Sequence, residues 1–131
     1  MKKVDLCLVG GSAGSLIPFR TLLEDMKKSS LNNTAVVLFQ HLAADATSMM
    51  KNIMEGATDW KVVNIDSKVT IHPRTVYLNS PGVGIILKNG RIELGTSNEK
   101  SVSPISDFWE TAVDDFENCR TMTTILLSGG G

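Results

Sequence analysis

Residues 4–14 read VDLCLVGGSAG and combine a short apolar run with a serine flanked by glycines. The run from Val4 to Val9 has the length and composition of a buried strand. Apolar residues recur at helical spacing from Gly14 onward, so Ser12 is predicted to lie in a tight turn between a strand and a helix. The spacing G-x-S-x-G is also that of a nucleophile elbow, whose glycines avoid steric clashes in the turn.

The same glycine-rich turn has simpler interpretations. It can pack a helix against a sheet, or bind a phosphate through the free backbone N–H groups at the start of the helix. The dinucleotide pattern G-x-G-x-x-G is not matched, and no lysine follows as in a phosphate-binding P-loop. The motif alone therefore leaves a catalytic and a structural role equally open.

The rest of the chain alternates between strand and helix patterns. Strands are predicted at 4–9, 35–39, 60–65, 75–78, 85–88, 91–94 and 121–127, and helices from Gly14, at 45–55 with Gly56 as the stop, and at 104–118. Asn89-Gly90 between two strand patterns favours a hairpin with a type I′ turn. This order predicts an α/β fold with a mostly parallel, doubly wound sheet and an antiparallel β-hairpin insertion.

The composition is that of an ordinary globular domain. The chain has 131 residues, of which 42% are hydrophobic and 21% charged, and its net charge of -1 gives no indication of nucleic-acid binding. Two cysteines form no disulfide framework or metal motif; Cys7 is predicted to be a core residue, and a reducing, cytoplasmic setting fits. No stretch approaches the ~20 apolar residues of a membrane span, and Asp5 interrupts the N-terminal apolar run, which disfavours a signal peptide.

The candidate catalytic residues follow the ends of predicted strands. In an open parallel sheet, ligands bind beyond the carboxyl ends of the strands, and Ser12, His41 and the turn 128–131 each follow a strand. Histidine is the usual base for a serine nucleophile, and the N–H groups of Ala13 and the terminal glycines are candidate oxyanion donors. The alternative for His41 is a loop histidine without a role, and His72, before Pro73, is interpreted as structural.

A carboxylate that would orient the histidine is not evident. No obvious partner is found among five aspartates of the sequence: Asp5, Asp66, Asp107, Asp114 and Asp115. A strand followed by a glycine-rich turn normally leads into another helix in such folds, whereas this sequence stops at Gly131. We therefore expect a fragment cut inside a strand-to-helix loop, with the carboxylate beyond Gly131.

Taken in order, four segments resemble the catalytic domain of the CheB-type chemotaxis methylesterases. They are VGGSAG at 9–14, QHL at 40–42, Pro73 with VYL at 76–78 and PG at 81–82, and LLSGGG at 126–131. The similarity extends along most of the chain. The residues SDF at 106–108 and those around Leu127 look most similar to the methylesterase domain that is fused to a receptor methyltransferase.

The resemblance implies hydrolysis of glutamate methyl esters on the cytoplasmic helices of chemoreceptors, within a chemotaxis phosphorelay; many members also deamidate glutamines. It implies Ser12 as nucleophile, His41 as general base and the backbone of Gly130 as an oxyanion donor, with an aspartate after Gly131. No metal or organic cofactor is implied. Three departures from the family pattern concern Ser15, where the family usually has a second glycine, Ser103, where many members carry an arginine, and the triad aspartate, which is not present in these 131 residues.

Two other functions remain open at this point. The first is a catalytically degenerate module that still docks on a receptor or another signalling protein. The second is an unrelated G-x-S-x-G serine hydrolase. The α/β-hydrolase version of the latter is disfavoured, because its nucleophile normally follows several strands and Ser12 follows the first.

Overall fold

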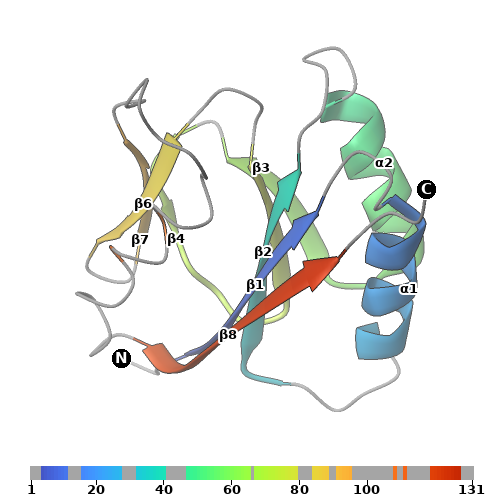
Figure 1. The fold of residues 1–131 in the computed structure, drawn as a ribbon, viewed down its shortest axis with the longest axis horizontal. Coiled ribbons are helices and arrows are strands. Elements are labelled where there is room, and N and C mark those ends of the chain that lie inside the picture. The colour runs from blue at the N-terminus through green and yellow to red at the C-terminus, as the bar shows by residue number, and fades with distance from the viewer. Residues whose placement is uncertain are drawn as a thin grey trace.

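A computed structural model describes residues 4–11, 16–27, 32–40, 47–65, 67–79, 84–88, 91–95, 108, 111 and 119–127. Its main sheet has five strands in the order β3-β5-β2-β1-β8 (Figure 1). Their bounds are β1 Val4–Gly11, β2 Thr34–Gln40, β3 Lys61–Ile65, β5 Thr75–Asn79 and β8 Cys119–Leu127. Every pairing in this sheet is parallel, which confirms the predicted mostly parallel α/β fold.

Two helices of the described chain, α1 (Leu16–Lys27) and α2 (Thr47–Ala57), cover one face of the main sheet (Figure 1). Phe19 and Leu23 of α1 and Met54 of α2 are buried in a core that also contains Val9 of β1 and Val36 of β2. The apolar residues of α1 therefore face the sheet, as their helical spacing predicted.

Gly56 does not stop α2 as predicted. The helix passes through Gly56 and ends at Ala57. Gly56 has no left-handed backbone conformation, and a Cβ built on it would meet no atom within 4 Å. The residue is therefore an exposed helical glycine rather than the left-handed cap that its position had indicated.

A second, antiparallel sheet covers the other face of the main sheet (Figure 1). It has the order β4-β7-β6, with β4 at Val69–Thr70, β6 at Gly84–Lys88 and β7 at Arg91–Gly95. The predicted hairpin is confirmed, because β6 and β7 pair with Lys88 opposite Arg91. The two-residue strand β4 was not predicted, since two residues are too few to give an alternating pattern.

The β6–β7 hairpin contributes buried side chains to the hydrophobic core. Ile85, Leu87 and Ile92 are almost fully buried and belong to the same cluster as Leu8 of β1 and Val37 of β2. Consecutive residues of β1 and β2 are thus buried on alternate faces of the sheet. This explains why both strands are almost continuously apolar, as is typical of strands in a doubly covered parallel sheet.

The helix predicted at 104–118 falls largely outside the described residues. Of that segment, Phe108 and Thr111 are described, and both have helical backbone. The Thr111 hydroxyl accepts a hydrogen bond from the backbone N–H of Leu87 (2.8 Å) and donates one to the carbonyl of Phe108 (2.8 Å). The Phe108 ring packs against Phe39 at 5.6 Å between centroids. These contacts hold this part of the chain between β6 and β2.

Arg74 fixes the start of β5 between its two neighbours. Its backbone is left-handed, with φ 53°. Its N–H donates to the carbonyl of Thr34 (2.7 Å) and its carbonyl accepts from the N–H of Lys61 (3.2 Å), so it joins the beginnings of β2 and β3. The guanidinium lies over Trp60, 5.4 Å from the ring centroid, and 3.7 Å from a carboxylate oxygen of Asp59.

We predict that Arg74→Gly is more stable than Arg74→Ala by about 1 kcal/mol, because only the alanine keeps a Cβ that opposes the left-handed backbone. Both changes remove the same side-chain contacts, so the difference isolates the backbone. The measurement is the free energy of unfolding in urea. The matched control is Asn52 in α2, where alanine should be the more stable replacement by about 1 kcal/mol. The same order at both positions would contradict the prediction.

Candidate active site

The carboxyl ends of the three strands β2, β1 and β8 lie side by side at one edge of the main sheet (Figure 1). Gly11, the last residue of β1, is paired with Gln40 at the end of β2 and with Leu127 at the end of β8. Neighbouring strands in a sheet are about 4.7–4.9 Å apart. The three chain segments that follow these strands therefore start close together.

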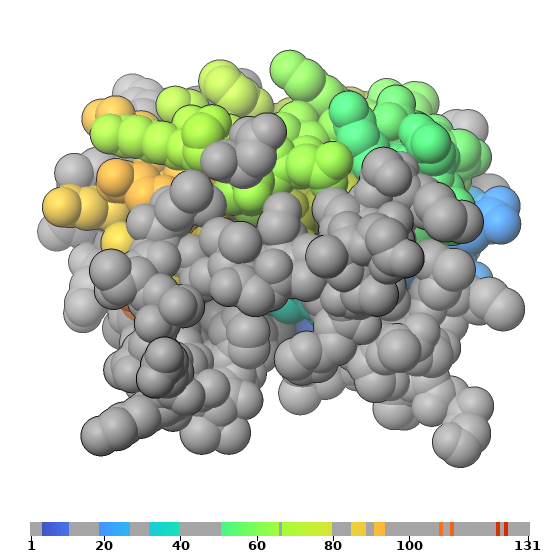
Figure 2. All heavy atoms as spheres, turned by 90° about the horizontal axis from the view of Figure 1, so that it is seen from above, coloured from blue at the N-terminus to red at the C-terminus, as the bar shows by residue number. Residues whose placement is uncertain are grey.

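The residues predicted for the site follow these three strand ends in the sequence. Ser12 and Ala13 come after Gly11, His41 comes after Gln40, and Gly130 comes shortly after Leu127. All four lie outside the described residues. The structure places the strand ends that precede them, Gly11, Gln40 and Leu127, which we call their anchor points. Figure 2 views the molecule from the side to which β1 and β2 point, with α2 in green and the β6–β7 hairpin in yellow to orange.

The strands that lead to Gly11 and Gln40 are buried in the residues before their ends. Leu8 and Val9 of β1 and Val36 and Val37 of β2 are completely buried. Their side chains pack on both faces of the sheet, and the register between the two strands is continuous from Asp5 to Gly11. A rigid pair of strands is a suitable support for a catalytic site, because small displacements of catalytic groups are costly.

Cys7 lies on β1, four residues before Gly11, and is buried as predicted. Burial raises the pKa of the Cys7 thiol above its ordinary value. A buried thiol with a raised pKa stays protonated and is a poor nucleophile. Cys7 is therefore a core residue and not a candidate nucleophile.

The described aspartates lie away from the carboxyl edge, the edge of the main sheet at which β1, β2 and β8 end. Asp5 pairs with Thr34 at the beginning of β2, at the opposite edge of the sheet. Asp25 is exposed on α1, and Asp59 lies beside Arg74 before β3. The aspartates at 66, 107, 114 and 115 lie outside the described residues. Within the described ranges, no aspartate is placed to orient a histidine at this edge.

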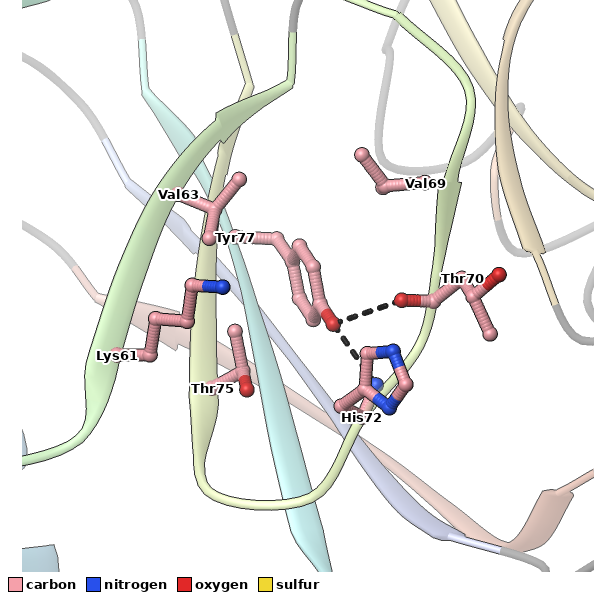
Figure 3. A pocket seen from close by; sticks show the side chains of 7 residues that line it. All are labelled: Lys61, Val63, Val69, Thr70, His72, Thr75 and Tyr77. Atoms are coloured by element: carbon pink, nitrogen blue, oxygen red, sulfur yellow. Dashed lines mark hydrogen bonds between the residues drawn. The ribbon is translucent and has the colours of Figure 1, made fainter.

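The structure also has a pocket of about 340 Å³ at the amino ends of β3 and β5, facing β4 (Figure 3). His72 lies at this pocket, and its backbone N–H donates a hydrogen bond of 2.8 Å to the Tyr77 hydroxyl. This contact is made by the backbone of His72 and not by its imidazole ring. No sequence motif marks the pocket, since its lining comes from the three strands β3, β4 and β5 and from a turn, which only tertiary packing brings together.

In the part of the chain that the structure describes, no helix is both long and apolar enough to cross a membrane.

The fold and the residues that follow the ends of β1 and β2 define a class of protein. It is a parallel α/β domain in which a glycine-flanked serine and a histidine directly follow adjacent central strands in the sequence. The family model of the CheB methylesterases matches residues 7–131, and the chain belongs to this family. The resemblance noted in the sequence is thereby confirmed, and with it the assignment to a family of methylesterase-type hydrolases.

A solved structure with the same fold is the crystal structure of the Thermotoga maritima CheB methylesterase catalytic domain. The TM-score is 0.73 at 16% sequence identity, and the alignment covers 99% of this chain and 70% of that one. At this identity the similarity concerns the fold. A search of curated proteins found no match.

We predict that the Cys7 thiol contributes a fall in stability above about pH 9, its ordinary pKa. The folded protein keeps the thiol proton at a pH where the unfolded chain loses it, so the unfolded state is favoured as the pH rises. The measurement is the free energy of unfolding in urea as a function of pH. Cys7→Ala should show a shallower fall than the parent protein.

Val9→Ala is the matched control, because Val9 is a buried residue of the same strand and cluster that carries no titratable proton. It should lower stability at every pH and leave the slope unchanged. Equal slopes in the parent and Cys7→Ala would show that the thiol titrates alike in the folded and unfolded states.

Proposed function

We propose that the chain is a protein-glutamate methylesterase domain that acts on methylated chemoreceptors in the cytoplasm, through Ser12 and His41. The observation that carries this proposal is the pairing of Gly11 with Gln40, the residues that directly precede Ser12 and His41. A serine nucleophile and its base must come within hydrogen-bonding reach of one another. Anchors at the same level of adjacent parallel strands favour that approach.

In the proposed reaction, the Ser12 hydroxyl attacks the ester carbonyl while His41 takes its proton. The backbone N–H groups of Ala13 and Gly130 stabilise the oxyanion. Collapse of the intermediate releases methanol, which takes the proton from His41, and leaves an acyl group on Ser12. Water then hydrolyses the acyl-enzyme with His41 again as the base, and free glutamate is restored. With a glutamine substrate the same steps release ammonia and amount to deamidation.

The proposal includes a triad aspartate after Gly131, which would hold His41 in the correct tautomer. Its support is the position of the described aspartates, all of which lie away from the carboxyl edge. The reaction requires no metal or organic cofactor. The proposed partner is a methyl-accepting chemoreceptor or a similarly methylated signalling protein, and nucleic acid is not a proposed ligand.

A second candidate function is a docking module that binds the receptor without hydrolysing it. It is favoured by the same observation on the aspartates, because a histidine without an orienting carboxylate is a weak base for a serine. Hydrolysis is preferred since Ser12 and His41 both follow the paired ends of central strands. A receptor-binding protein that does not react with a fluorophosphonate at Ser12 would favour the docking module.

We predict that Ser12→Ala and His41→Gln each reduce methanol release from a methylated receptor at least about 1,000-fold, because each removes an indispensable part of a unit that acts together. The assay uses the full-length protein that the gene encodes. Ser67→Ala, an exposed serine before β4, is the matched control and should keep full activity. Wild-type activity in the Ser12 or His41 variant would contradict the assignment.

We also predict that the 131 residues alone release little or no methanol, since the orienting carboxylate is proposed to lie after Gly131. The 131-residue and full-length proteins are compared at equal concentration on the same methylated receptor. The prediction is contradicted if the 131-residue protein hydrolyses the receptor and Ser12→Ala abolishes that activity.

A further inference from the structure

The pocket between β3, β5 and β4 lies at the end of the main sheet opposite to the candidate active site. Lys61 and Thr75 are the first residues of β3 and β5 and both line it, whereas the candidate site follows the last residues of β1 and β2. A ligand in the pocket would therefore leave the carboxyl edge of the sheet free. At about 340 Å³ the pocket is at the small end of the range of roughly 300–1,000 Å³ for ligand sites.

Hydrogen bonds hold the walls of this pocket together (Figure 3). The Tyr77 hydroxyl donates to the carbonyl of Thr70 (3.0 Å) and accepts from the backbone N–H of His72 (2.8 Å). The tyrosine is 2% exposed, and burial raises the pKa of its hydroxyl, so the group stays protonated. One buried side chain of β5 thus fastens the segment that carries β4 across the face of the main sheet. The pocket is therefore formed before any ligand arrives.

The pocket has an apolar floor and a polar rim. Val63 of β3, Val69 of β4 and the buried Tyr77 supply the apolar surface. Lys61, which is exposed, stands at the rim. Thr70 faces Tyr77 with its backbone carbonyl, and its side chain points away from the pocket (Figure 3). Figure 3 shows the Lys61 amine directed from β3 toward the Tyr77 ring.

The charge of the lining is positive and is not neutralised by the described residues. No carboxylate lines the pocket. The neighbouring cations have carboxylates close by: Lys68 lies 3.8 Å from Glu93, and Arg74 lies 3.7 Å from Asp59. Lys61 takes part in none of the ion pairs among the described residues. An ammonium that is not neutralised by a carboxylate and stands beside an apolar floor is a favourable site for an organic anion.

We propose that this pocket binds a small organic carboxylate that carries a short branched apolar group. The carboxylate accepts a hydrogen bond from the Lys61 ammonium, and the apolar group packs on the two valines and the Tyr77 ring. This chemistry is shared by free short-chain acids and by the C-terminal leucine or valine of a polypeptide. The pocket is separate from the proposed catalytic edge, so its occupation does not depend on Ser12.

The test is a titration of the isotope-labelled 131-residue protein, followed by the amide signals of the pocket residues in ¹H–¹⁵N spectra. The probes are 4-methylpentanoate and the acetylated dipeptide glycyl-leucine, each compared with its neutral amide. We expect saturable shifts at residues 61–77 with at least one of the two acids, and no saturable shifts with either amide. Binding of the free acid alone assigns the site to small acids, and binding of the peptide acid alone assigns it to a polypeptide C-terminus.

Lys61→Gln should weaken binding of the acid about fivefold, the effect of removing one partly exposed charge pair. Thr70→Val should leave binding unchanged, because the Thr70 side chain points away from the pocket. Lys51→Gln is the matched control, because that lysine lies on α2 beside Glu55, away from the pocket. Ser12→Ala should bind the acid as the parent does, which separates this proposal from the proposed catalysis.

Three results would overturn the proposal. They are the absence of saturable shifts with both acids, equal binding of an acid and its amide, and equal weakening by Lys61→Gln and Lys51→Gln. Each variant's own spectrum checks that it is folded. Lys61 and Thr70 are exposed, so both replacements should fold.

Discussion

The pairing of β1 with β2 on one side and β8 on the other is the constraint on which the rest of the structure depends. Backbone hydrogen bonds between parallel strands are satisfied only in a fixed register, and burial on both faces prevents the register from slipping. Because the three strands run in the same direction, their last residues reach the same edge together. The position of that edge determines where the candidate site lies, and the layers packed on the sheet help to keep the strand ends in place.

The two covering layers stabilise the sheet in different ways. On one face, α1 and α2 bury the side chains of one apolar cluster, as an amphipathic helix does on any α/β sheet. On the other face, a three-stranded antiparallel sheet provides the cover, and hydrogen bonds of single side chains attach it. Tyr77 bonds to the backbone of the segment that carries β4, and Thr111 bonds to β6. The second layer depends on specific polar contacts as well as on buried apolar area, and it is also where the acid-binding pocket is proposed.

Several features could be predicted from the sequence because they are local. The apolar runs of β1 and β2, the helical spacing of Phe19, Leu22, Leu23 and Met26, and Asn-Gly in the hairpin each reflect a preference of a short segment. The prediction that Gly56 ends the helix was wrong, since a glycine near the end of a helix is compatible with both a helical and a left-handed backbone. The strand β4 could not be found, because Val69 and Thr70 are extended only through pairing with β7.

The sequence by itself determined the family, the parallel α/β class and the order of the candidate residues Ser12, His41 and Gly130 along the chain. These follow from local patterns and from the spacing of motifs. Only the tertiary structure decided the strand order, the pairing of Gly11 with both Gln40 and Leu127, and the use of the hairpin sheet to cover the second face. The physical reason is that these features depend on contacts between segments far apart in sequence, whose free energy appears only when the whole core is assembled.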